Sequence, residues 1–436
     1  MRCWEVARLR VIADLHIHSH YSMATSERMR PEEIARYAEI KGLSIVGTGD
    51  FAHPMWLKEL RETMVSEPNG LYRLVSGNHP SVHFMASAEV STVFTVKSGV
   101  KKVHHVILTP SFEAAAQISD RLSRYGNLAS DGRPTLDINA AHLVEEVMEV
   151  SNRNMVFPAH AWTPWFSIFG AFSGFDSIEE CYEDMTKHIC ALETGLSSDP
   201  PMNWRLSGLD RFTLVSNSDC HSFWPWRIGR EANVFELERP NYDDVLAAIR
   251  TKDAGRFKFT IETDPAYGKY HWTGHRNCNV SLPARESARL GNICPVCRRR
   301  LTKGVEQRVE ELADRTAGFR PEGAIGFIHL LPLSEIIATV LGVDSSSVEK
   351  VWSVYNALTE KFGNEYSVLM DRSKNELSSI GGEHLAEAIV RVREGRDKVV
   401  PGYDGVYGQP VIFEEEPQRK MSPKRVQQLN LTDFTL

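Results

Sequence analysis

Residues 14–20, Asp-Leu-His-Ile-His-Ser-His, carry the side chains with the clearest capacity for chemistry. His16 and His18 alternate at the end of an apolar run, and alternate residues of a strand point to the same face. Imidazole is the commonest side-chain ligand of transition metals. The spacing therefore predicts that both rings enter one metal site, and a surface histidine run without any ligand is the alternative. His20 has no matching partner in this pattern.

Carboxylates and histidines also follow the other apolar runs in the first half of the chain. These further candidate ligands are Asp50, His53, Glu89, His104, His105, His160, Asp219 and His221. Their recurrence at the ends of successive strand-like segments predicts that they converge on one site. His104 and His105 flank a single run, and the pattern leaves the choice between them open. Cys220 should point to the opposite face and is expected to be structural.

A site of this composition suits the hydrolysis of a phosphoester. Neutral imidazoles and carboxylates bind Zn²⁺, Mn²⁺ or Mg²⁺, and the number of candidate ligands allows two or three divalent ions. Such ions activate water and stabilise the attacking and leaving oxygens, so no protein nucleophile is needed. We expect Asp50, Glu89, Asp219 and His221 to lie closest to the reaction.

The order of these residues along the chain resembles the PHP family of phosphoesterases. The resemblance implies a distorted (β/α)7 TIM-like barrel that holds up to three metal ions. It also implies which side chains bind them: His16, His18, Glu89, His104, His160, Asp219 and His221, with Asp50 or His53 contributing.

Short apolar runs alternate with amphipathic stretches over residues 1–262, which favours a parallel sheet with crossover helices. Residues 31–41 and 138–151 have helical spacing of apolar positions. In a closed β/α barrel the strand ends form the active-site edge, and the candidate ligands lie there. The strand candidates include residues 9–15, 43–47, 83–89, 102–108, 155–158, 191–193 and 213–216.

Composition divides the chain into four regions. Residues 1–264 form the predicted catalytic barrel, and residues 265–303 contain the clustered Cys and His of a predicted zinc-binding module. Residues 304–400 are predicted to form a helical C-terminal domain, and residues 401–436 form a polar tail. The helical spacing in the third region covers residues 305–316, 333–341, 345–362 and 383–393.

The predicted zinc-binding module contains two pairs of ligand types separated by fifteen residues: His275 and Cys278, then Cys294 and Cys297. Two such pairs are typical of a structural Zn²⁺ site. His271 is a rival for His275, which we favour because its spacing to Cys278 mirrors the second pair. Arg298 and Arg299 follow directly, so the module is a candidate surface for binding DNA phosphates.

Two loops near the candidate ligands are rich in aromatic and basic side chains: Trp162, Trp165, Phe166, Trp224, Trp226, Arg227 and Arg230. Aromatic rings can stack on an exposed base, and arginines can bind phosphates. Ordinary packing between the barrel and the second domain is the alternative. Residues 167–174 are a further candidate for reading a base.

The 436 residues carry a net charge of −7, with 42% hydrophobic and 25% charged residues. This balance is that of a globular protein, and any contact with nucleic acid must use a local basic patch. No run is apolar over the roughly 18 residues that a membrane span needs, and the first residues contain no apolar signal core. We therefore expect a cytoplasmic protein with no membrane partner. Seven cysteines without framework spacing favour thiols and a metal site over disulfides.

The last nine residues contain Gln428, Leu431 and Phe434 at a spacing that resembles the PCNA-interacting peptide. Such peptides dock on sliding clamps as one turn of helix. Thr435 replaces the usual second aromatic residue, which should weaken the interaction, and a chance match in a polar tail is the alternative. A clamp-binding peptide of this type favours an archaeal origin and a location at the nucleoid of the archaeal cytosol.

Longer blocks resemble the endonuclease Q family of DNA repair nucleases from archaea and some bacteria. They include Ala-Asp-Leu-His-Ile-His-Ser-His-Tyr-Ser, Val-Gly-Thr-Gly-Asp-Phe-Ala-His-Pro and Pro-Ala-His-Ala-Trp-Thr-Pro-Trp-Phe, and the likeness extends over roughly residues 10–410. The resemblance implies nicking of double-stranded DNA on the 5′ side of uracil, hypoxanthine, xanthine and abasic sites. A small-molecule phosphatase with an accessory zinc domain and a non-catalytic DNA or clamp adaptor are the alternatives.

Overall fold

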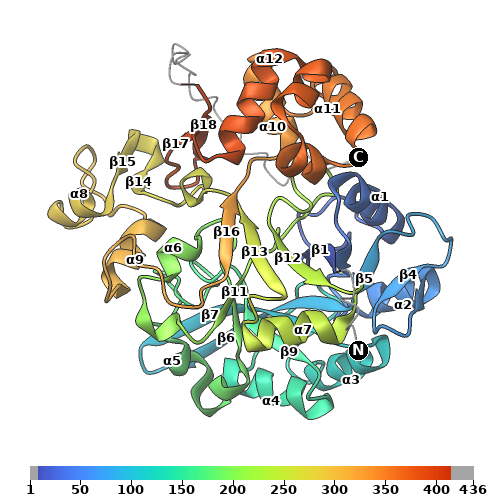
Figure 1. The fold of residues 1–436 in the computed structure, drawn as a ribbon. Helices are drawn as coiled ribbons and strands as arrows, with labels where there is room; N and C mark the ends of the chain where they lie inside the picture. Colours follow the sequence, from blue (N-terminus) through green and yellow to red (C-terminus); the bar gives the residue numbers. More distant parts are fainter. Residues whose placement is uncertain (1–7, 414–436) are drawn as a thin grey trace, which may run out of the picture.

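The computed structural model of the chain describes residues 8–413 and shows an α/β body with a group of helices packed on one side (Figure 1). The strands are β1 (Leu9–Asp14), β2 (Ile45–Gly47), β3 (Met64–Ser66), β4 (Tyr72–Leu74), β5 (His83–Met85), β6 (Ser87–Val96), β7 (Gly99–Leu108), β8 (Thr135–Leu136), β9 (Met155–Pro158), β10 (Ala191–Glu193), β11 (Thr213–Val215), β12 (Ala232–Leu237), β13 (Phe257–Glu262), β14 (Thr273–His275), β15 (Val280–Leu282), β16 (Gly326–His329), β17 (Lys398–Val400) and β18 (Gln409–Val411).

The helices begin and end where their local sequence dictates. The ring of Pro31 presets a helical φ at the start of α1, and Gly42 ends the helix in a left-handed conformation with φ 98°. Within residues 8–413, no helix is long and apolar enough to cross a membrane. The α-helices are α1 (Pro31–Lys41), α2 (Pro54–Thr63), α3 (Phe112–Leu122), α4 (Ala140–Val150), α5 (Ile178–Tyr182), α6 (Pro200–Asn203), α7 (Tyr242–Thr251), α8 (Ala284–Arg289), α9 (Val305–Leu312), α10 (Leu333–Leu341), α11 (Glu349–Phe362) and α12 (Lys374–Arg393).

The largest sheet contains eight strands in the order β16-β13-β12-β1-β2-β5-β4-β3, and a second sheet has the order β8-β6-β7-β9. Strand β1 is parallel to β2, β2 is parallel to β5, and β10 is parallel to β11. In contrast, β1 and β12, β6 and β7, and β7 and β9 are antiparallel pairs. The predicted α/β fold with a helical C-terminal part is confirmed. The expectation of a purely parallel sheet is wrong, because short connections such as the β6–β7 hairpin reverse the chain.

Most of the strands expected from the sequence lie at the expected places, and residues 83–89 are the exception. This run divides at Ala86 into β5, which joins the large sheet, and β6, which joins the second sheet. The split places Glu89 in β6, directly opposite Val106 of β7. Glu89 therefore belongs to a long hairpin and not to the end of a parallel strand.

One strand of the region expected to be helical belongs to the large sheet. Strand β16 pairs in parallel with β13, and helices α10 to α12 follow it and pack on one another. Leu333, Tyr355 and Ile389 of these helices belong to the same buried cluster as Ile12 and Val46 of the large sheet. The apolar core is therefore continuous between the two parts.

A buried ion pair fixes the C-terminal helices against the first part of the chain. The Lys41 ammonium of α1 lies 2.8 Å from the Glu365 carboxylate and donates a second bond of 2.8 Å to the carbonyl of Pro225. Tyr355 donates to the same carboxylate at 2.7 Å, and so does the backbone N–H of Leu333 at 3.0 Å. Because nearly every polar atom of the pair is satisfied, two fully buried charges are tolerated here.

We predict that Glu365→Gln lowers the free energy of unfolding by roughly 3–5 kcal/mol, because it leaves the Lys41 charge buried without a partner. Denaturant unfolding measures the change. The matched control is Glu62→Gln in the exposed Lys58–Glu62 pair of α2, where about 0.5 kcal/mol or less is expected. Equal effects of the two substitutions would show that the buried pair does not anchor the helices.

Candidate active site

The carboxylate of Glu89 lies at the centre of the candidate ligands. Two groups of side chains, each with its ligand atoms within 4.8 Å of one another, share this residue. The first group is His16, His18, Glu89 and Asp219, and the second is Glu89, His104 and His160. Six of the residues expected to bind metal are thus brought together, from β6, β7 and the segments after β1, β9 and β11.

The two oxygens of Glu89 face different groups. Oε2 lies 3.1 Å from His18 Nε2 and 3.4 Å from His16 Nε2, and His18 Nε2 is also 3.0 Å from Asp219 Oδ1. Oε1 lies 2.8 Å from His104 Nδ1 and 3.1 Å from His160 Nε2. One carboxylate therefore stands between two sets of ligand atoms, which is the arrangement of a bridging ligand.

The far nitrogens of the histidines are held by oxygen acceptors, as in many metal sites. His18 Nδ1 lies 2.9 Å from Asp50 Oδ1, and the other Asp50 oxygen accepts bonds from Ser19 and Ser22. Both Asp50 oxygens are thus engaged, and the residue orients His18 from outside the two ligand groups. His16 Nδ1 lies 3.1 Å from both oxygens of Glu193.

Sequence reasoning missed Glu193 as a functional residue. It ends β10, and besides His16 it accepts the backbone N–H of His160 at 2.7 Å and an amide N–H of Asn217 at 2.8 Å. One buried carboxylate thereby fixes a side chain from each ligand group. A signal was present, since Glu193 is an acidic residue at the end of an apolar strand.

Several buried ligand atoms have no hydrogen-bond partner among the described residues. They are His16 Nε2, His18 Nε2 and Asp219 Oδ1, and all three face the same point. Leaving buried polar atoms without a partner costs free energy, so their convergence fits a bound cation. The imidazole and carboxylate donors suit a divalent transition metal.

The charges of the cluster also favour a cation. Burial opposes protonation of His16 and His18, yet the neighbouring carboxylates outweigh burial and raise the pKa of both rings well above the ordinary value. Burial would raise the pKa of Glu89, but His104, Arg133 and His16 hold it well below its usual range. The carboxylates are therefore ionised, and a metal ion can supply the positive charge that they require.

The backbone at the site is held in uncommon conformations. Asp50, His160 and Asp219 have φ values of 50°, 29° and 47°, in the region that favours glycine. Gly49 has φ 63°, and a Cβ there would lie 2.3 Å from the carbonyl oxygen of Ile17. Such strain clusters at functional sites, where the surrounding structure enforces it.

The register of β7 decides between the two adjacent histidines. His104 points toward Glu89, whereas His105 bonds to Tyr182 at 2.8 Å and to Thr92 at 2.9 Å on the other face of the strand. Burial lowers the pKa of His104 to about 4, so the ring is neutral at physiological pH, as a metal ligand must be.

Three other histidines lie outside the two ligand groups. His53 is buried and stacks on Tyr21 with ring centroids 4.3 Å apart, and His20 lies 3.5 Å from Glu59. His221 lies near the site, with its ring 4.3 Å from that of His18, but its Nδ1 bonds to the carbonyl of Asp219. The structure therefore gives no support for His53 as a ligand and leaves His221 at the edge of the cluster.

A cavity of about 560 Å³ opens above the ligand groups. His104, His160, Asp219 and His221 line one end, and Arg133 lies beside them with Nη1 3.3 Å from Glu89. Sequence reasoning missed Arg133. The expected DNA contacts in its lining are Trp165, Phe166, Trp226, Arg227 and Arg230.

The structure corrects one of the proposed base contacts. Trp162 is buried in the core, and its indole N–H donates to Asn203 at 2.8 Å, so the ring is not accessible to a base. Trp224 does not line the cavity; it is partly exposed, and its ring contacts those of Trp226 and Trp352 of α11. Residues 167–174 do not line the cavity either.

Trp165 is an exposed aromatic residue that lines the cavity. Its ring stacks on that of Phe172 with centroids 5.0 Å apart, and the two side chains are 41% and 50% exposed. Tyr270 meets Trp165 edge-on from the following region. Phe172 belongs to residues 167–174, the segment predicted from the sequence as a candidate for reading a base.

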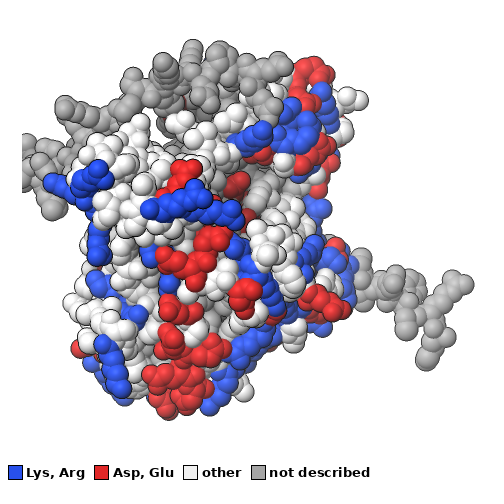
Figure 2. All heavy atoms as spheres, turned by 90° about the vertical axis from the view of Figure 1, so that its left-hand side faces the viewer, with Lys and Arg blue, Asp and Glu red and all other residues white. Residues whose placement is uncertain are grey.

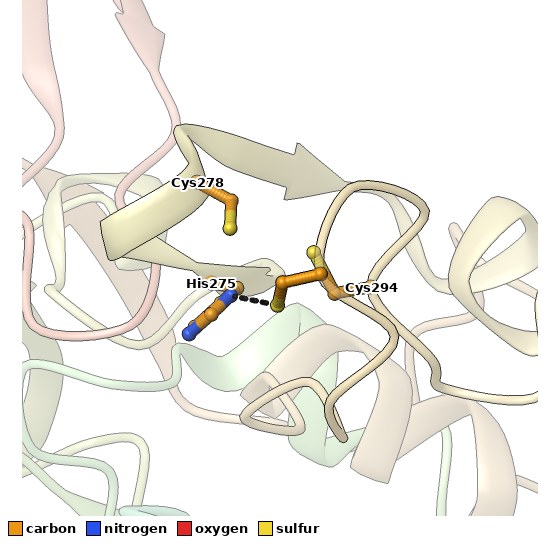
Figure 3. A group of neighbouring side chains, drawn as sticks. His275, Cys278 and Cys294 are labelled. Atoms are coloured by element: carbon orange, nitrogen blue, oxygen red, sulfur yellow. Dashed lines mark hydrogen bonds between the residues drawn. The ribbon is translucent and has the colours of Figure 1, made fainter.

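The four side chains of the predicted zinc-binding module converge (Figure 3). His275 ends β14, Cys278 follows one turn later, and Cys294 and Cys297 come from the loop after α8. His275 Nδ1 lies 3.3 Å from Cys297 Sγ, whereas His271 is outside the group. Desolvation opposes ionisation of Cys294, but hydrogen bonds outweigh it and lower the thiol pKa to about 6.

Arg298 and Arg299 are exposed beside this group. Figure 2 shows the face of the molecule that carries β14 and β15, and on it Lys and Arg side chains are interspersed with Asp and Glu. This face is therefore not one continuous basic patch, and any contact with phosphates must use local groups of arginines.

Comparison with known proteins supports the family expected from the sequence. The profile of the MJ0043 C-terminal domain matches residues 332–396. The *M. jannaschii* protein MJ0043 is 32% identical over 259 residues, but the match covers 57% of this chain and only 31% of that protein. YqxK of *Bacillus subtilis* is 27% identical over 92% of this chain and 98% of its own length.

Two solved structures match the chain along most of its length. The lesion-specific endonuclease PfuEndoQ from *Pyrococcus furiosus* is 34% identical, with a TM-score of 0.83 over 93% of this chain and 96% of its own. An endonuclease Q bound to a 27-mer duplex with an abasic lesion at its active site is 33% identical, with a TM-score of 0.82 over 95% and 100%. These relatives place the chain among the DNA endonucleases. It belongs to the endonuclease Q family, as the sequence blocks predicted.

Two further buried carboxyl groups, Glu231 and Glu262, interact with each other outside the ligand groups. Glu231 accepts from Ser216 at 3.2 Å and from the backbone N–H of Thr263 at 3.2 Å, and Glu262 accepts from Thr194 at 2.9 Å. Burial raises the pKa of Glu231 to about 8 and that of Glu262 well above its ordinary value. Glu231 is thus protonated in the folded protein at neutral pH and ionised in the unfolded chain.

We predict that the folded protein loses stability as the pH rises from the ordinary pKa of a glutamate toward about 8, because the stabilising contribution of neutral Glu231 is complete only below its unfolded pKa and is lost once the folded group ionises. The melting temperature, measured across the pH range below about 8, should fall less steeply in Glu231→Gln than in the wild type. Glu236→Gln, at a partly exposed position of β12, is the control and should keep the wild-type slope. An identical slope in all three proteins would contradict the assignment.

Proposed function

We propose that the protein nicks double-stranded DNA on the 5′ side of deaminated bases (uracil, hypoxanthine, xanthine) and of abasic sites by multi-metal hydrolysis. The observation that carries this proposal is the carboxylate of Glu89, shared by two groups of ligand atoms at the end of a cavity. The abasic lesion at the active site of the related complex supports the abasic substrate.

The residues present fit divalent ions. His16, His18, Glu89 and Asp219 would hold one ion, and Glu89, His104 and His160 would hold a second, with Zn²⁺, Mn²⁺ and Mg²⁺ as candidates. When bound, such ions activate water and stabilise negative charge on the phosphate oxygens. Asp50 and Glu193 orient the ligating rings, and His221 is placed to contact the substrate at the edge of the cluster.

Basic and aromatic side chains around the cavity would position the DNA. Arg133 lies next to Glu89, so its guanidinium can bind the phosphate that reaches the cluster. Arg227 and Arg230 add positive charge along the wall. The exposed Trp165–Phe172 stack can fill the space that an extruded nucleotide leaves in the duplex.

The other regions take supporting roles in this proposal. Residues 1–264 form the catalytic unit, which we place in the PHP barrel class because a bridge between Ile17 and Cys220 joins the end of β1 to the segment after β11. Residues 265–303 hold a structural Zn²⁺ through two ligand pairs, and Arg298 and Arg299 contact the duplex. Residues 304–400 form the helical domain, and β16 ties it to the sheet.

The terminal peptide extends the proposal to a sliding clamp. Gln428, Leu431 and Phe434 would dock on PCNA, and they lie outside the described residues. Pulldown of purified archaeal PCNA by the full chain, but not by a Leu431→Ala and Phe434→Ala variant, tests this contact and the location at the nucleoid that it suggests.

The central experiment incubates the metal-loaded protein with duplexes that carry one uracil, hypoxanthine or abasic site, and with a phosphomonoester. We expect a nick beside each lesion and little phosphomonoester hydrolysis. Asp219→Ala should reduce nicking at least about 100-fold, since loss of a ligand removes several kcal/mol of charge stabilisation. The exposed Asp184→Ala is the matched control. Absence of nicking, or nicking by Asp219→Ala at the wild-type rate, would overturn the proposal.

The same assay tests the aromatic stack. Trp165→Ala combined with Phe172→Ala should lower nicking by roughly 10-fold or more, because each stacked ring contributes about 1–3 kcal/mol. Phe319→Ala, at another exposed ring, is the control. Wild-type rates in the double variant would show that the stack does not contact the DNA.

A further inference from the structure

Part of the cavity wall is built from three separate parts of the chain. Tyr267 comes from the segment after β13, Glu335 comes from α10, and Tyr407 comes from the segment before β18. Arg227 lines the same cavity. The C-terminal helical region thus contributes directly to the wall, and its most unusual contribution is an acidic group.

An acidic side chain such as Glu335 is not expected in a cavity that serves only to bind an anion. An ionised carboxylate there repels a phosphate; burial raises the pKa of Glu335, while the bond from Tyr267 and the nearby Arg227 and Arg230 act in the opposite direction and favour the ionised form. The hydroxyl of Tyr267 donates to Glu335 Oε2 at 2.7 Å and fixes the direction of the carboxyl group. A carboxylate that lines the cavity and is held by Tyr267 is a hydrogen-bond acceptor of fixed position.

We propose that Glu335 is a specificity-determining residue, which accepts the ring N–H of a deaminated base extruded into the cavity. The inference rests on the proposed function and deepens it. Uracil carries this N–H at N3, and hypoxanthine and xanthine carry it at N1, each beside a carbonyl group. Cytosine and adenine present a lone pair at the corresponding ring nitrogen, and that lone pair would face the lone pairs of the carboxylate.

Arg227 complements this contact. A guanidinium on the same wall can donate to the carbonyl oxygen that deamination creates, and the amino group of cytosine or adenine cannot accept such a bond. Thymine and guanine share the N–H and the carbonyl, and they differ from the lesions at the C5 methyl and the C2 amino group. Glu335 therefore accounts for the rejection of cytosine and adenine.

The volume of the cavity is consistent with this occupant. About 560 Å³ lies within the range of pockets that enclose small ligands, and it joins the ligand groups to Glu335 without interruption. A nucleotide can then place its 5′ phosphate at one end and its base at the other. An abasic nucleotide has no base to contact Glu335. Nicking at an abasic site is therefore the internal reference for the experiment.

The test compares nicking of duplexes that carry uracil, cytosine or an abasic site at the same position. The variants are Glu335→Ala, Glu335→Gln and Tyr267→Phe, with the exposed Glu322→Gln as the matched control. Glu335→Ala should lower the ratio of uracil to abasic nicking roughly tenfold or more, because the ring N–H loses a charged acceptor. Glu335→Gln should lower the ratio of uracil to cytosine nicking, because an amide can turn to donate to the cytosine nitrogen.

Tyr267→Phe should change both ratios in the same direction by a smaller factor, because Glu335 loses its orienting bond but remains on the cavity wall. Glu322→Gln should keep the wild-type ratios. Equal loss of uracil and abasic nicking in Glu335→Ala would show a structural role only and would overturn the inference. Unchanged ratios in both Glu335 variants would also overturn it. A wild-type protein that nicks no lesion would defeat the proposed function itself, an outcome separate from any change in ratio.

Discussion

The burial of one carboxylate among four imidazoles is the constraint on which the site depends. Glu89 is fully buried and faces His16, His18, His104 and His160. An ionised carboxylate in such a place requires compensating positive charge, which Arg133 supplies in part at 3.3 Å and which bound cations would complete. Cations bound on both sides of Glu89 would satisfy the carboxylate and the histidine nitrogens together. The strained backbone, together with the carboxylates of Asp50 and Glu193, then holds these ligands in place.

The C-terminal helices complete the site and do not merely cover it. The Lys41–Glu365 pair and the shared core fix α10 against the first part of the chain, so Glu335 reaches the cavity from a distant segment. A mixed cavity of this kind separates two tasks. In the proposed function, residues of the strand ends would carry the chemistry, while residues of the later segments would meet the part of the substrate that differs between lesions. Recognition of the substrate could thus change without any change in the metal ligands.

Much of the site was predictable, because ligand identity is a local property of the sequence. His16 and His18 needed only strand alternation, and the paired spacing of Cys278 and Cys297 was enough to place the cysteine cluster. Burial and register are not local properties. The sequence could not decide between His104 and His105, because the pairing of β6 with β7 sets which side chain faces Glu89.

The wrong and the missed predictions also arise because burial and register are not local properties of the sequence. Trp162 lies in a loop that sequence alone could not distinguish from an exposed one, and its burial depends on contacts with residues far along the chain. Glu193 and Arg133 were missed because an acidic strand end and a loop arginine are common, and only the three-dimensional arrangement shows what they contact. Strand β16 was read as part of a helical region because a four-residue strand carries little periodic signal.

The most direct measurement of the central claim is the anomalous diffraction map of crystals of the Mn²⁺-loaded protein. The account predicts one peak bounded by His16, His18, Asp219 and Glu89, and another bounded by Glu89, His104 and His160. The carboxylate of Glu89 should lie between the two peaks. A map with a single peak, or with peaks that Glu89 does not contact, would contradict the account.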